Sequence, residues 1–119
     1  MRILMAVAMT CMLVACGTKS PVTQNVVYDL ENGYGVVQAS AVAYSKLPYC
    51  GGKISVACKK PAVVIKLASL DKDARLALNG LEAYARNPAN ATVTFASVVN
   101  AATVAVGALT QYELSQGIK

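Results

Sequence analysis

The chain has 119 residues, a formal net charge of +5 at pH 7, and neither His nor Trp. This length allows one small domain with a modest core. The basic residues are scattered, with no stripe of Lys and Arg interleaved with aromatic residues, which argues against a nucleic-acid-binding protein. The lack of His removes the commonest general base.

The first segment has the layout of a secretory signal peptide. Arg2 gives a positive start, and residues 3–15 are nearly all apolar. This apolar stretch is too short to span a bilayer comfortably. All four Met residues lie at or before Met12, which marks the segment as separate from the folded domain. An ordinary signal peptide or an N-terminal membrane helix is the alternative to the interpretation that follows.

The end of this segment reads LVACG (residues 13–17) and resembles the lipobox of bacterial lipoproteins. The resemblance covers residues 1–17. It implies that residues 1–15 are removed, that Cys16 carries a diacylglycerol, and that its new amino group carries an acyl chain such as palmitate. Two or three acyl chains hold a protein firmly on a membrane, whereas one does so only marginally. In this family, a residue other than Asp after the Cys implies outer-membrane sorting, and Gly17 meets that condition.

Residues 16–20 are expected to form the lipidated Cys and a short tether, and residues 21–119 a helical domain. Ser20 and Pro21 are typical of the N-cap and the first position of a helix. Apolar residues at steps of three and four then share one helical face: Val27, Leu30, Tyr34, Val37, Ala41 and Tyr44. Pro48 ends this first predicted helix.

Cys50 and Cys58 bracket the Gly-containing loop that follows. With Cys11 removed and Cys16 acylated, they are the two thiols left in an oxidising compartment, which favours a structural disulfide. A redox pair or a metal site is the alternative. Redox pairs usually have C-x-x-C spacing, and zinc needs more ligands than two Cys, so we expect no metal.

Pro61 begins a second predicted helix, and Asn87 and Pro88 end it. Its apolar face again follows steps of four and three: Val63, Leu67, Leu70, Ala74, Ala77, Leu81 and Tyr84. Two pairs of opposite charge lie four residues apart at positions expected to be exposed: Asp71 with Arg75, and Glu82 with Arg86.

The third predicted helix begins near Asn90, a plausible N-cap, and runs towards Gly117. No charged residue lies between Arg86 and Glu113, and one face is apolar: Phe95, Val99, Ala102, Val106 and Leu109. A helix that is apolar nearly all round is buried, oligomeric or membrane-embedded. We favour the central helix of a bundle. Self-association or a protein partner through residues 90–117, and a membrane span, are the alternatives. Alternation of polar and apolar residues over 92–95 also allows a short strand.

No catalytic set of residues is recognisable, so we expect a protein that is not an enzyme. We also expect no cofactor beyond the lipid on Cys16 and no small-molecule substrate. Tyr28 and Tyr49 lie off the apolar stripes. They are candidate contact residues, because Tyr is enriched at interfaces.

From Tyr44 onward, SKLPYC, a Gly-containing loop and CKKPAVVIKL resemble small helical lipoproteins of tailed phages and prophages. The resemblance covers residues 44–86. It implies a disulfide-stapled envelope protein with no catalytic residues to carry over.

We therefore expect an all-α fold of three antiparallel helices, with a disulfide-closed loop between the first two. The expected function is a structural or interaction role on the periplasmic face of the outer membrane, where the lipid is the membrane contact. The alternative is a lysis or superinfection-exclusion factor in which residues 91–109 act on a membrane.

Overall fold

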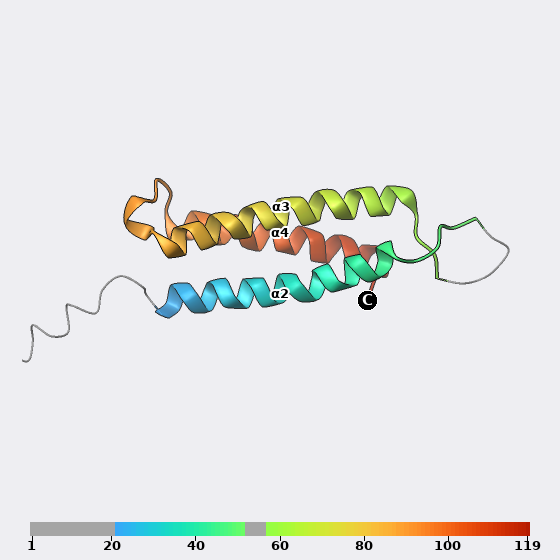
Figure 1. Cartoon of the computed structure of the whole chain (residues 1–119), viewed down its shortest axis with the longest axis horizontal. Coiled ribbons are helices and arrows are strands. Elements are labelled where there is room, and N and C mark those ends of the chain that lie inside the picture. Colours follow the sequence, from blue (N-terminus) through green and yellow to red (C-terminus); the bar gives the residue numbers. More distant parts are fainter. Residues whose placement is uncertain (1–20, 52–56) are drawn as a thin grey trace, which may run out of the picture.

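The computed structural model describes residues 21–51 and 57–119, which form a bundle of three helices (Figure 1). The helices are α2 (Pro21–Ser45), α3 (Pro61–Arg86) and α4 (Phe95–Ser115), and a short 3-10 helix, η2 (Pro88–Asn90), follows α3. Helix α3 runs antiparallel to α2 and α4, as Figure 1 shows. The prediction of an all-α, three-helix fold is confirmed.

Proline sets the boundaries of α2 and α3. Pro21 and Pro61 are the first residues of these helices. Proline suits the first helical position because that backbone nitrogen needs no intrahelical acceptor. Asn87, the residue before Pro88, leaves the helical region with φ −144° and ψ 66°, and α3 ends there. The predicted cap Ser20 lies outside the described residues.

The start of α4 differs from the prediction. Asn90 is the last residue of η2, not a helix N-cap. The cap is Thr94, which is extended (φ −83°, ψ 153°) and accepts a hydrogen bond on Oγ1 from the Ser97 N–H at 3.2 Å. The short strand considered over residues 92–95 does not form, because Thr94 makes this capping bond instead of a strand pair.

The end of α4 is closed by a glycine turn. Gly117 has φ 70°, a conformation that favours glycine, and the Ile118 N–H donates to the Glu113 carbonyl at 3.0 Å. This turn brings Ile118 back into the core, where it is buried beside Leu109.

The core consists of two apolar clusters along the bundle. The first joins buried residues of α3 and α4 to Val27 and Leu30 of α2: Ala74, Leu78, Leu81, Ala102 and Val106. The second joins the opposite ends of the same helices: Val63, Leu67, Leu109 and Ile118, with Val37, Ala41 and Tyr44 of α2. Every residue of the predicted first stripe packs against these clusters. In the second stripe, Tyr84 instead packs on the Phe95 ring at 5.6 Å between centroids.

Helix α4 is a full member of the bundle and packs against both α2 and α3. Its predicted apolar face is the one that faces the core. Within residues 21–51 and 57–119, none of the helices combines the length and the apolar character needed to cross a membrane.

Candidate functional site

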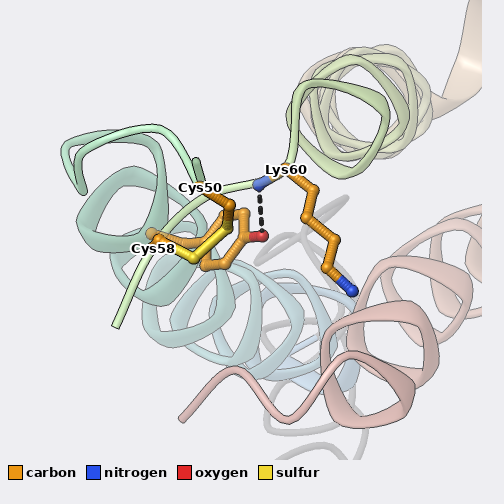
Figure 2. Close-up of a disulfide and its surroundings, with 4 residues drawn as sticks. Cys50, Cys58 and Lys60 are labelled. Atoms are coloured by element: carbon orange, nitrogen blue, oxygen red, sulfur yellow. Dashed lines mark hydrogen bonds between the residues drawn. A yellow bond between two sulfur atoms is a disulfide. The ribbon is translucent and has the colours of Figure 1, made fainter. Parts of the chain in front are cut away.

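The connection between α2 and α3 is closed by a disulfide between Cys50 and Cys58 (Figure 2). Their Cα atoms are 5.0 Å apart. Gly51, directly after Cys50, has φ 144°, in the region that favours glycine. A disulfide that closes so short a loop stabilises a fold by roughly 2–3 kcal/mol in the chain-entropy model. The predicted disulfide and its place between the first two helices are confirmed.

Backbone hydrogen bonds hold the two ends of this loop together next to the disulfide. The Cys50 N–H donates to the Lys59 carbonyl at 3.1 Å, and the Lys59 N–H donates to the Pro48 carbonyl at 2.8 Å. The Lys60 N–H donates to the Tyr44 hydroxyl at 2.9 Å, which ties the loop to α2 (Figure 2). The loop is therefore anchored at its base independently of the disulfide.

Lys59 links the loop to the end of α2. Its Nζ donates to the Ser45 carbonyl at 2.5 Å, where a cation complements the negative end of the helix dipole. The same Nζ lies 4.5 Å from the centroid of the Tyr49 ring, a cation–π geometry. Tyr49 nevertheless remains 64% exposed. It is thus held in position while its ring faces solvent.

The two candidate contact residues do not form one surface. Tyr28 is 65% exposed in the N-terminal part of α2, whereas Tyr49 lies beyond the C-terminal end of that helix. The rise of an α-helix separates them by roughly 25 Å or more. Cys16, the proposed lipidation site, lies outside the described residues.

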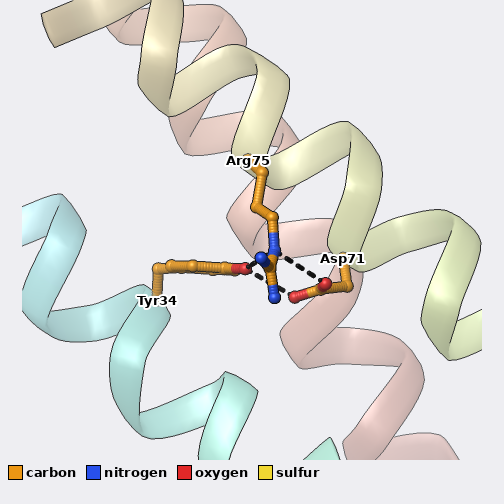
Figure 3. Close-up of polar contacts among 3 residues, drawn as sticks. All are labelled: Tyr34, Asp71 and Arg75. Atoms are coloured by element: carbon orange, nitrogen blue, oxygen red, sulfur yellow. Dashed lines mark hydrogen bonds and ion pairs between the residues drawn. The ribbon is translucent and has the colours of Figure 1, made fainter.

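A polar cluster joins α2 to α3 halfway along the bundle (Figure 3). The Tyr34 hydroxyl donates to Asp71 Oδ1 at 2.5 Å and accepts a bond from Arg75 Nε at 2.9 Å. Arg75 Nε also pairs with Asp71 Oδ2 at 2.9 Å. The Asp71–Arg75 pair was expected at exposed positions, but the Asp71 side chain is only 22% exposed, and the Tyr34 hydroxyl bonds to it.

The electrostatics of this cluster favour a neutral tyrosine. Burial and the hydrogen bond to Asp71 raise the pKa of Tyr34 to about 12, although Arg75 acts in the opposite direction. A phenol that stays protonated so far into alkaline pH is a hydrogen-bond donor and not a ready base or nucleophile. The cluster therefore serves to fix the packing of α2 on α3.

An open groove between α2 and α3 borders this cluster. It is mostly apolar, and its lining includes Gln38, Ala41, Val42, Val64, Ala68 and Arg75. The sequence pattern missed it, because a groove between two helices depends on how they pack and not on either stripe alone.

Glu113 is a buried charged residue that the sequence pattern did not single out. It is only 5% exposed, and its Oε1 has no hydrogen-bond partner among the described residues. Burial raises the pKa of the Glu113 carboxyl, which favours its protonated form. The signal that could have found it was its spacing, four residues beyond Leu109 on the core face of α4.

A pair of carboxyl groups, Glu31 and Glu82, lies where α2 meets the end of α3. A hydrogen bond with Glu82, then burial and the charge of Glu82, raise the pKa of Glu31, while Arg86 lowers it. Arg86 Nη2 pairs with Glu82 Oε2 at 2.7 Å, as the spacing predicted.

Comparison of the chain with protein-family models, curated proteins and solved structures gave no match. In the part of the chain that the structure describes, no group of three or more His, Cys, Asp or Glu residues could hold a metal ion. Among the described residues, the exposed Tyr49 and the groove between α2 and α3 are the surfaces that could make contacts.

Proposed function

We propose that this protein is a lipoprotein anchored through Cys16 to the periplasmic face of the outer membrane. The observation that carries the proposal is the LVACG motif (residues 13–17) after a basic start and an apolar run. The Cys50–Cys58 disulfide supports it, because disulfides persist in oxidising compartments such as the periplasm. Gly17 after the cysteine supports the outer membrane as the destination.

The proposed role of the anchored domain is structural or interactive, not enzymatic. Tyr34, Asp71 and Arg75 satisfy one another's hydrogen bonds in a cluster between helices. The exposed Tyr49, directly before Cys50, is a better candidate for contact with another protein. The likeness of residues 44–86 to small phage and prophage lipoproteins supports a phage-derived origin.

The packing of α4 favours a structural or interaction role over one in which residues 91–109 act on a membrane. Ala102, Val106 and Leu109 are buried against α2 and α3, so insertion of this segment into a bilayer would require the core to open. Burial of such side chains is worth about 1.5–3 kcal/mol each for Val and Leu.

The experiment that tests the anchor compares the wild type with Cys16→Ser in a Gram-negative host that processes lipoproteins. After phase separation in a cloud-point detergent, the wild type should enter the detergent phase. Cys16→Ser should enter the aqueous phase or stay as an uncleaved precursor. Cys11→Ser is the matched control, because Cys11 lies in the segment proposed to be removed, and it should behave as the wild type. Equal partitioning and equal mass of wild type and Cys16→Ser would contradict the proposal.

A further inference from the structure

The start of α2 and the connection between α3 and α4 lie at the same end of the bundle (Figure 1). Val27 and Leu30, near the start of α2, pack in the cluster that contains Phe95 and Val98 from the start of α4. Pro21, the first residue of α2, therefore lies at the same end of the bundle as residues 87–94.

The short chain length before α2 limits where a lipid on Cys16 can be. Five residue steps separate Cys16 from Pro21. A fully extended chain covers at most about 3.6 Å per residue, so the lipid would lie within roughly 18 Å of the start of α2. The disulfide loop is at the other end of α2, whose 25 residues span roughly 37 Å.

The α3–α4 connection has a surface that suits a lipid–water interface. Residues 87–94 carry no charge, and Val93 is 50% exposed. Val93 and Tyr84 line the same open hollow at this end, and Tyr is enriched at membrane–water interfaces.

We propose that the bundle stands on the membrane with residues 87–94 against the lipid surface and the disulfide loop pointing away. This inference rests on the proposed anchor at Cys16. Val93 then contacts the bilayer interface, and Tyr49 is presented to partners beyond the membrane. The disulfide and the backbone bonds next to it join Cys50 to Cys58 and Lys59 at that outer end.

The absence of Trp from the chain allows a direct test with single-Trp variants of the full-length, lipidated protein. Val93→Trp reports on the proposed lipid-facing end, and Tyr49→Trp on the outer end. Leu76→Trp, at a position 60% exposed on the side of α3, reports on a bundle lying flat. Each variant is placed in vesicles of phosphatidylethanolamine and phosphatidylglycerol that contain a brominated, quenching phospholipid.

The expected result is loss of most of the emission of Val93→Trp, with a blue shift relative to the detergent-free, unlipidated form. Tyr49→Trp and Leu76→Trp should keep their emission. Quenching of Leu76→Trp would overturn the proposal in favour of a flat orientation, and quenching of Tyr49→Trp alone would overturn it in favour of the inverse orientation. No quenching at Val93 would also overturn it.

The mass of each variant, measured before reconstitution, separates this proposal from that of the anchor. A variant that carries acyl groups but shows the wrong quenching pattern contradicts only the orientation. A protein without acyl groups contradicts the anchor itself. Far-ultraviolet circular dichroism identifies any variant that fails to fold. If Val93→Trp fails to fold, the double variant Thr92→Trp with Val93→Phe replaces it as the reporter.

Discussion

The Tyr34 hydroxyl acts as donor and acceptor at once, and this places one residue of α2 between two charged residues of α3. The bond to Asp71 is charge-assisted, and such bonds are stronger than neutral ones. Both partners are partly open to water, which reduces what the ion pair alone contributes. The tyrosine therefore matters more for the register of α2 on α3 than the salt bridge does.

Tyr34→Phe removes this hydroxyl while keeping the ring in the core. We expect the free energy of unfolding to fall by about 1 kcal/mol, the usual value for one hydrogen bond. Chemical denaturation with circular dichroism measures it. Tyr28→Phe, at an exposed position of the same helix, is the matched control and should change little. An unchanged stability of Tyr34→Phe would show that the cluster does not couple the helices.

Glu113 makes the stability of the folded protein depend on pH. Burial raises its pKa in the folded state above the unfolded value. The stability that goes with the protonated form is thus fully present below the unfolded pKa and is lost as the pH rises through the folded pKa. Glu31, whose pKa is raised mainly by its hydrogen bond with Glu82, acts in the same direction.

Glu113→Gln should therefore stabilise the protein at pH 7.5 by about 1 kcal/mol and have a smaller effect at pH 4, because the amide cannot ionise. Thermal unfolding at both pH values measures the difference. The control is Asp73→Asn on the exposed face of α3. Destabilisation by Glu113→Gln at pH 7.5 would mean that the ionised carboxylate has a partner.

At the scale of the helices, the sequence predicted the elements well where a single strong signal stood at a boundary. Pro61 and Pro88 fixed both ends of α3, and the steps of three and four identified the buried faces of all three helices. The predicted start of α4 was wrong because two good capping residues, Asn90 and Thr94, lie four residues apart. The 3-10 turn after Pro88 uses the first, which leaves the helix to begin after the second.

Substitution of these two residues tests which one caps α4. Thr94→Ala should lower the free energy of unfolding by about 1 kcal/mol, the typical cost of losing an N-cap. Asn90→Ala is the control and should cost clearly less, since Asn90 is the last residue of η2 and not a helix N-cap. Denaturant unfolding of both variants decides between them. A larger loss in Asn90→Ala would place the cap where the sequence pattern had it.

At the scale of the whole molecule, the fold class and the disulfide followed from the sequence, whereas the contacts between helices did not. The pairing of Cys50 with Cys58 was predicted from the expectation that Cys11 is removed and Cys16 acylated, which leaves these two thiols. The cluster of Tyr34 with Asp71 and Arg75 depends on the register of α2 against α3, which no pattern within one helix contains. The burial of Glu113 likewise required the position of α4 in the bundle.

The most direct test of the account is the intact mass of the protein extracted from host membranes, before and after reduction and alkylation. We predict the mass of residues 16–119 plus acyl groups, with two alkylated thiols that appear only after reduction. A mass that retains residues 1–15 and carries no lipid would contradict the anchor. Two thiols that alkylate without reduction would contradict the disulfide.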